Sequence, residues 1–225
     1  MKKHALFFIL IFLASKHSAA LAQSAATPDS YQITITEVKL CSDVNCTASS
    51  VLGNKNMTLD LADGTGGVGA AARKYVDTSS VTPGTYTHAR ITLANAVRVL
   101  GSVPGVTGGG GTVTCNTSTA GVADNGFGDN IQINAPSGTA GLMTYVVKRV
   151  PPGFAVPPGL TISGVPGSFV HLTYQLPGTL VMNQGDALPR VNVTFTVTNA
   201  LHAEYNGSNC IMYIMPPVLD ITAAP

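Results

Sequence analysis

The segment best suited to metal chemistry is an Asp/Asn-rich stretch near the middle of the chain. It contains Asp124, Asn125, Asp129 and Asn130, with two glycines among them. Calcium prefers such hard oxygen ligands on a tightly bent backbone. The stretch lacks the terminal bidentate Glu of an EF-hand, and Asp, Asn and Gly are also ordinary turn residues. The sequence therefore leaves two interpretations open, a calcium site and a simple turn.

Three histidines form a second candidate metal site. His88, His171 and His202 each lie in or beside a strand-like run. Three imidazoles that converged would make a copper or zinc site. Histidines on strands are more often ordinary half-buried or surface residues. The sequence alone does not show that the three side chains meet.

Patterns for enzyme catalysis find little support. Residues 64–69 match GxGxxG, but a dinucleotide site needs that turn between a strand and a true helix. No GxSxG nucleophile elbow occurs, and the eleven acidic residues show no obvious pair for glycoside hydrolysis. We therefore predict that the protein is not an enzyme and has no cofactor, apart from the calcium considered above.

The four cysteines predict a disulfide framework. Cys41, Cys46, Cys115 and Cys210 allow three pairings. The turn-like residues between Cys41 and Cys46 favour a link between these two, which leaves Cys115 to pair with Cys210. A four-cysteine zinc site would require CxxC-like knuckles, and the sequence has none. Disulfides also indicate an oxidising compartment.

Composition narrows the class of protein further. The 225 residues are 45% hydrophobic and only 10% charged, with a formal net charge of +1. Soluble domains usually carry about 25% charged residues. The chain has no basic field that would hold nucleic acid, and its hydrophobicity excludes intrinsic disorder. A compact β-rich domain remains.

The first residues predict export. Lys2 and Lys3 precede an apolar run over residues 5–14, and Ala20 and Ala22 supply the small residues read by a signal peptidase. This pattern is a signal peptide over residues 1–22, because the run is too short for a membrane span. No transmembrane segment is predicted in the mature chain. We expect a location in the periplasm, on the cell surface or outside a Gram-negative bacterium.

The elements that position these candidate residues are predicted to be strands. Alternating runs lie at residues 31–40, 57–61, 86–93, 131–133, 142–147, 160–162, 170–176, 180–182, 191–197 and 211–215. Gly, Pro, Asn and Asp separate them. About ten short strands predict an all-β fold, a disulfide-stapled Greek-key β-sandwich. We expect a single domain over residues 31–225, preceded by a short leader at residues 23–30.

Three local features refine this prediction. A switch in the apolar phase predicts a β-bulge near Thr36 and Glu37. The run that follows Pro83 and Gly84 predicts a central strand, with Tyr86 in or beside the core. Residues 105–111, which end in four consecutive glycines, predict a flexible loop.

Several of these segments resemble an uncharacterised domain family of exported bacterial and archaeal proteins. Residues 33–40, 59–61 and 83–91 are similar to its first strand and to its "PGTYTxxR" strand. Pro136-Ser137-Gly138 with Gly141 resembles its later PSG segment. The resemblance covers about residues 31–147 and implies a prealbumin-like or immunoglobulin-like sandwich. It implies no established activity and carries no functional residues.

Two classes of function remain open. The first is a structural or interaction protein of the cell envelope, a surface, adhesion or filament-type subunit that acts through protein partners or self-association. The low charge and the abundant strands of this chain suit assembly by strand addition. The alternative is a periplasmic metal- or ligand-binding protein or enzyme that uses the strand histidines or the Asp/Asn stretch.

Overall fold

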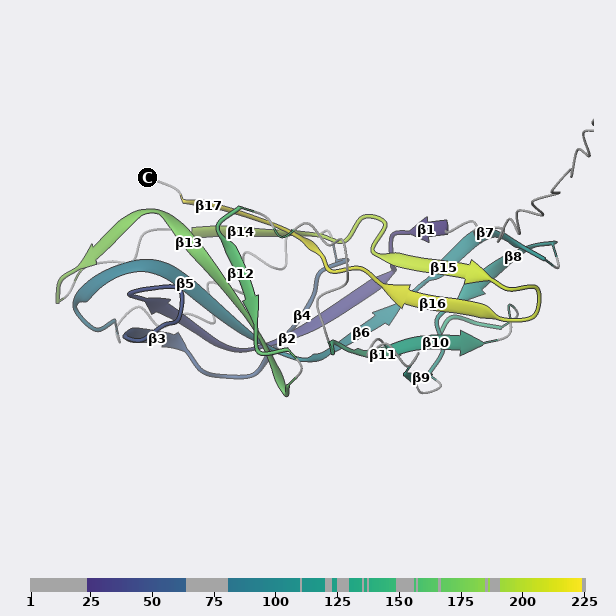
Figure 1. Ribbon diagram of the computed structural model, residues 1–225, viewed down its shortest axis with the longest axis horizontal. Helices are drawn as coiled ribbons and strands as arrows, with labels where there is room; N and C mark the ends of the chain where they lie inside the picture. Colours follow the sequence, from purple (N-terminus) through teal and green to yellow (C-terminus); the bar gives the residue numbers. More distant parts are fainter. Residues whose placement is uncertain are drawn as a thin grey trace, which may run out of the picture.

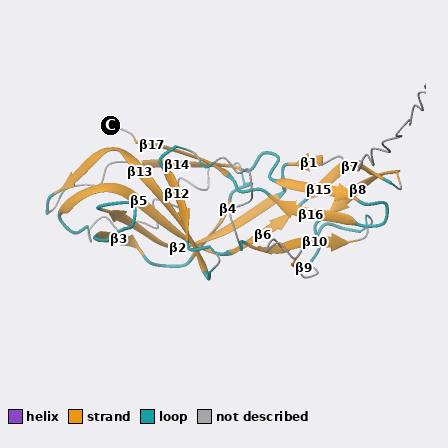
Figure 2. Ribbon diagram, viewed as in Figure 1, coloured by secondary structure: helices purple, strands orange, loops and turns teal. Residues whose placement is uncertain are grey.

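The computed structural model describes residues 24–63, 81–109, 111–119, 123–124, 130–134, 136, 138–148, 156, 158–165, 167–184, 186 and 191–223. All regular elements within these ranges are β-strands, as Figure 2 shows. The predicted all-β fold is therefore confirmed. The predicted signal peptide over residues 1–22 lies outside the described residues.

The largest sheet has eight strands and is antiparallel. Its order is β11-β6-β2-β5-β13-β12, and β3 and β4 also pair with β2. Its strands are β2 (Ser30–Cys41), β3 (Ser49–Gly53), β4 (Met57–Asp60), β5 (Gly84–Ala94), β6 (Ala96–Leu100), β11 (Met143–Val146), β12 (Leu160–Ser163) and β13 (Phe169–Met182). In Figure 1, β2 runs along the long axis of an elongated molecule.

Strand β2 is shared by both ends of the molecule. Its first residues pair with β6 and β4, and its last residues pair with β5 and β3. The register with β5 shifts between Ile35 and Glu37, which confirms the bulge predicted near Thr36. An extra residue at this point moves the following side chains to the opposite face. This explains the switch in the apolar phase of the sequence.

The remaining strands form a second sheet and two separate pairs. The second sheet has the order β1-β15-β16-β10-β9. Its strands are β1 (Ser24–Ala26), β9 (Ala123–Asp124), β10 (Asn130–Asn134), β15 (Leu201–Tyr205) and β16 (Cys210–Ile214). The pairs are β7 (Ser102–Gly108) with β8 (Gly111–Asn116), and β14 (Val191–Thr196) with β17 (Val218–Ala223).

The main hydrophobic core lies between the two sheets. It contains twenty buried residues of the described chain, most of them contributed by β2, β4, β6 and β11 on one side and by β15 and β16 on the other, with β7 and β8. Its largest fully buried side chains are Tyr31, Met143, Leu201 and Met212. Since the two sheets face each other across this core, the predicted β-sandwich is confirmed. We call this part of the molecule the sandwich half.

The opposite end, which we call the curled half, has a much smaller buried cluster. It consists of the last residues of β2, most of β5, and strands β3, β12 and β13, and the ribbons of β5 and β13 curve at this end of the molecule in Figure 1. Its buried cluster contains four residues, Leu40, Leu52, Tyr86 and Met182. Strand β5 lies between β2 and β13, so the predicted central strand and the buried position of Tyr86 are both confirmed.

Each half contains one disulfide, and both predicted pairings are confirmed. Cys115 and Cys210 join β8 to β16 across 95 residues, with both cysteines fully buried in the main core. Cys41 and Cys46 close a short loop at the end of β2, with a sequence separation of 5. The Cα–Cα distances of 5.6 and 4.6 Å lie within the usual disulfide range.

The glycine-rich segment differs from the prediction. Within the predicted loop at residues 105–111, residues 105–108 belong to β7 and Gly111 begins β8, and Gly108 pairs with Gly111. A Cβ on Gly108 would lie 1.8 Å from the carbonyl oxygen of Tyr205, so only glycine allows β7 to approach β15 this closely. Gly105 has a φ of 70° at the point where the register shifts. These glycines meet local steric requirements within an ordered hairpin.

The segment that we expect to be a short leader contains a strand. Within residues 23–30, Ser24–Ala26 form β1 and pair with Leu201–Ala203 of β15. Pro28 is buried, and Ser30 begins β2. The segment was too short, and its side chains too small, to show an alternating pattern. Strand pairing therefore begins within residues 23–30 and not after them.

Candidate functional site

The Asp/Asn-rich stretch is placed only in part. Asp124 and Asn130 lie opposite each other where β9 pairs with β10. Asn125 and Asp129 lie outside the described residues. The pairing brings the two ends of the stretch together, as a hairpin turn would. The calcium site remains a prediction.

The three histidines do not meet. His202 lies on β15 in the second sheet, with its ring 5.5 Å from that of Tyr213. His88 and His171 lie on neighbouring strands, but His171 is opposite Thr92, four residues from His88. That offset corresponds to about 13 Å along a strand. Within the described part of the chain, no three His, Cys, Asp or Glu residues form a group that could hold a metal ion.

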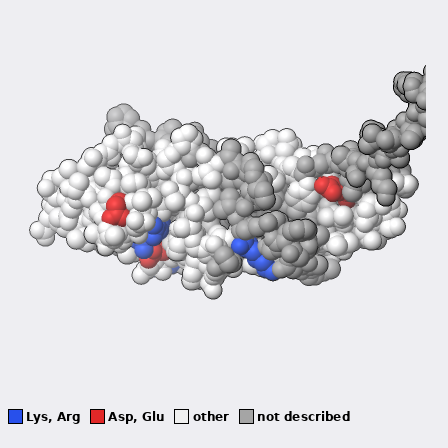
Figure 3. All heavy atoms as spheres, in the orientation of Figure 1, with Lys and Arg blue, Asp and Glu red and all other residues white. Residues whose placement is uncertain are grey.

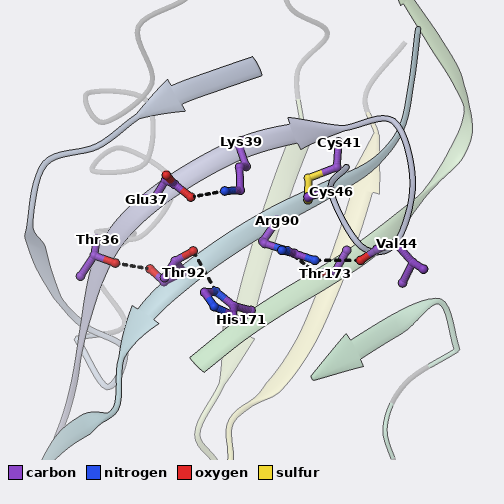
Figure 4. A network of polar contacts seen from close by, with 10 residues as sticks. All are labelled: Thr36, Glu37, Lys39, Cys41, Val44, Cys46, Arg90, Thr92, His171 and Thr173. Atoms are coloured by element: carbon purple, nitrogen blue, oxygen red, sulfur yellow. Dashed lines mark hydrogen bonds and ion pairs between the residues drawn. A yellow bond between two sulfur atoms is a disulfide. The ribbon is translucent and has the colours of Figure 1, made fainter. Parts of the chain in front are cut away.

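A polar face on the curled half is the stronger candidate. Three neighbouring strands contribute to it, β2, β5 and β13 (Figure 4). Residues directly opposite each other in an antiparallel sheet project from the same face. One row across this face consists of Lys39, Arg90 and Thr173, and the next of Glu37, Thr92 and His171. With His88, which precedes Arg90 by two residues on β5, these residues form what we call the Arg90 face.

Two hydrogen bonds fix the guanidinium group of Arg90. Its Nε–H donates to the hydroxyl of Thr173 at 2.8 Å, and its Nη2–H donates to the carbonyl oxygen of Val44 at 2.8 Å. Thr173 is fully buried, so its hydroxyl is a rigid acceptor beneath the arginine. Both acceptors are neutral. Arg90 forms no ion pair with any of the described residues.

The loop that carries Val44 is itself held in place. The Cys41–Cys46 disulfide closes it, and the hydroxyl of Thr87 donates to the carbonyl oxygen of Ser42 at 2.6 Å. The carboxylate of Asp43 accepts hydrogen bonds within the loop, including one from the backbone N–H of Asn45 at 2.8 Å. A hydrogen bond from the side chain of Thr47 is the main reason that the pKa of Asp43 is lowered. The loop therefore presents its carbonyl to Arg90 from a fixed position.

The remaining charges on this face neutralise each other. Lys39 Nζ lies 2.7 Å from Glu37 Oε1, and the two side chains are 20% and 30% exposed. An ion pair of this kind cancels both charges locally. Because Lys39 is paired in this way, Arg90 supplies the uncompensated positive charge of the face.

His171 is neutral near pH 7. Its Nδ1 shares a hydrogen bond of 3.2 Å with the hydroxyl of Thr92. Burial lowers the pKa of His171 below its usual 6.5, and the positive charges of Arg90 and Lys39 lower it further, while Glu37 acts in the opposite direction. The face thus combines a fixed cation with a neutral imidazole. Such a set is suited to binding an anionic group.

The sequence contained part of the signal for this face. Polar residues occupy every second position in Glu37–Lys39, His88–Thr92 and His171–Thr173. This alternation predicts one polar face on each strand. What the pattern does not contain is the register, which sets Arg90 between Lys39 and Thr173. Without the register, the pattern indicates the histidines as candidates and gives no sign of the setting of Arg90.

Comparison with known proteins adds no relative. No family model, no curated protein and no solved structure matches this chain. Among the residues described, no helix is long and apolar enough to cross a membrane.

Proposed function

We propose that this protein is an exported structural or interaction protein of the cell envelope that acts by protein–protein contact. The resemblance to an uncharacterised family of exported domains forms part of this proposal, as does the predicted signal peptide. The two disulfides support folding in an oxidising compartment. The observation that carries the proposal is the chemistry of the strand edges.

Natural proteins protect exposed strand edges with charged residues, especially lysine. Here β12, the last residues of β13, and the pair β14–β17 contain no Lys, Arg or Glu, and their single acidic residue is Asp220. Among the described residues, β12 pairs only with β13, and β14 and β17 pair only with each other. Such edges can accept a further strand through main-chain hydrogen bonds.

The surface beside these edges is short of charge. Figure 3 shows one face of the molecule on which few described side chains are charged. Two of the most exposed apolar residues lie on edge-forming strands, Val181 on β13 at 60% and Val218 on β17 at 62%. Exposed apolar side chains next to unprotected edges favour association.

Charged substitutions at these edges test the proposal. The mature protein is examined by size-exclusion chromatography with light scattering and by electron microscopy, and we expect oligomers or filaments. Val181→Lys and Val218→Lys should each shift the population towards monomer, because lysine on an edge opposes strand addition. Ser208→Lys, which places the same charge in an exposed turn, is the matched control.

Comparison of the edge variants with the control distinguishes strand addition from other causes of assembly. Loss of assembly in the edge variants, with assembly retained in Ser208→Lys, supports strand addition. A wild-type protein that stays strictly monomeric and shows no surface display would contradict the proposal. Thermal melts of all variants confirm that each substitution has left the fold intact.

A further inference from the structure

We propose that the Arg90 face is a binding site for a monovalent organic carboxylate. Among the described residues, Arg90 donates hydrogen bonds only to the neutral oxygens of Thr173 and Val44, which hold it as a fixed cation. A guanidinium group carries five N–H donors. These two bonds use the Nε–H and one Nη2–H, so no described residue accepts a hydrogen bond from the other three. Their planar fork matches the two oxygens of a carboxylate.

The site is organised before any ligand arrives. Thr173 is fully buried beneath the arginine, and the disulfide-closed loop holds the carbonyl of Val44. A ligand therefore binds without paying the entropy of fixing a long side chain. Arg90 is also half-buried, which strengthens its attraction for an anion relative to a fully exposed arginine.

The charge of the face selects the valence of the ligand. Lys39 is neutralised by Glu37 at 2.7 Å, and the ring of His171 is neutral near pH 7, so one net positive charge remains. One carboxylate matches that charge. A dianion such as phosphate would carry a second negative charge towards Glu37, without a second cation to stabilise it.

His171 couples binding to pH. The charged groups that face it are Glu37 and Lys39 on β2 and Arg90 on β5, and β12 contributes the uncharged Ser163 opposite it. A bound carboxylate would counteract the effect of Arg90 and raise the pKa of His171. Linkage then requires binding to strengthen as the pH falls and this histidine takes up a proton.

Acetate is the probe, and nuclear magnetic resonance is the readout. The mature protein, with both disulfides formed, is titrated with sodium acetate at about pH 7, at constant ionic strength maintained with sodium chloride. We expect saturable shifts of the Arg90 Nε–H signal and of the His171 ring, together with a rise in the pKa of His171. Arg90→Gln should abolish these shifts. Arg98→Gln, which removes an exposed arginine on β6, should leave them unchanged.

Glu37→Gln provides a test that unfolding cannot imitate. This substitution frees Lys39 and removes the repelling carboxylate, so acetate should bind about fivefold more tightly, the equivalent of about 1 kcal/mol for one such charge interaction near the surface. The proposal would be overturned if sodium chloride alone reproduced the shifts, if the Arg90→Gln variant still bound acetate, or if the Glu37→Gln variant bound acetate no more tightly than the wild-type protein. Preferential binding of inorganic phosphate would overturn the assignment of a monovalent ligand.

Discussion

The sandwich half and the curled half use different means to hold the same large sheet. In the described residues, the main core of the sandwich half buries twenty side chains, whereas the cluster of the curled half buries four. The curled half compensates with polar contacts, in which Arg90, Thr173 and a disulfide-closed loop fix one another. One half is therefore specialised for stability, and the other holds a polar surface in a defined shape.

This division has a physical cause. Two facing sheets can bury apolar side chains between them, so the sandwich half gains most from the hydrophobic effect. In the curled half, Glu37, Arg90 and His171 remain half-buried on one face of the large sheet. Ordered hydrogen bonds then limit the freedom of side chains that the solvent still reaches.

The largest expected difference between the halves concerns their disulfides. Replacing Cys115 and Cys210 with alanine should reduce the free energy of unfolding by about 4.7 kcal/mol, because this bridge closes a loop of roughly 95 residues. Replacing Cys41 and Cys46 should cost about 2 kcal/mol, since that loop is short. Denaturant unfolding of the two double variants measures both values. Equal losses would contradict the assignment of stability to the sandwich half.

A matched pair of leucines compares the two clusters directly. Leu201→Ala removes a fully buried side chain from the main core and should cost about 4 kcal/mol. Leu52→Ala, in the smaller cluster, should cost about 2 kcal/mol, because few buried neighbours surround the space and they can relax into it. Chemical denaturation gives both numbers. If Leu52→Ala is the more damaging change, the smaller cluster is the more rigid one.

The two halves should also respond to acid in different pH ranges. The pKa of His171 is lowered from 6.5, mainly by burial. The unfolded chain therefore binds the proton more tightly, and the stability that this group provides falls as the pH drops below about 6.5. His171→Gln should flatten the curve of stability against pH in that range. A curve identical to that of the wild-type protein would contradict the lowered pKa.

Asp60 provides the corresponding test in the sandwich half. Burial raises the pKa of Asp60, but hydrogen bonds from Ser30 and from the backbone N–H groups of Tyr31 and Ala62 outweigh this effect, and the pKa is lowered from 3.8. Its contribution is present above about pH 3.8 and is lost as the pH falls through the folded-state value. Asp60→Asn should therefore change the acid limb of the curve only below the range affected by His171→Gln.

The smallest effect is expected on an exposed polar pair. The hydroxyls of Thr34 on β2 and Thr58 on β4 share a hydrogen bond of 3.0 Å at the surface. Thr34→Ala should change the free energy of unfolding by no more than about 0.5 kcal/mol. Thermal denaturation checks this value. A loss as large as that of Leu201→Ala would indicate that surface polar pairs contribute to the sandwich half as strongly as its core does.

The sequence was sufficient for features that depend on local patterns. Alternation located most strands, the phase switch located the bulge near Thr36, and a short turn identified the partner of Cys41. Features that depend on contacts between distant residues could not be predicted from the sequence. The Gly108 hairpin requires knowledge of Tyr205, and the setting of Arg90 requires the register of three strands. Strand β1 was missed because Ser24–Ala26 acquires its role only from its pairing with β15.

The continuity of β2 has a mechanical consequence. This strand runs along the long axis of the molecule, and its two ends lie in different halves (Figure 1). In antiparallel ladders, the hydrogen bonds lie perpendicular to the strands. A pull along the long axis therefore loads many of these bonds at once, in shear, and does not open them one after another from an end. Tension applied at one end of the molecule would pass through a single covalent strand to the other.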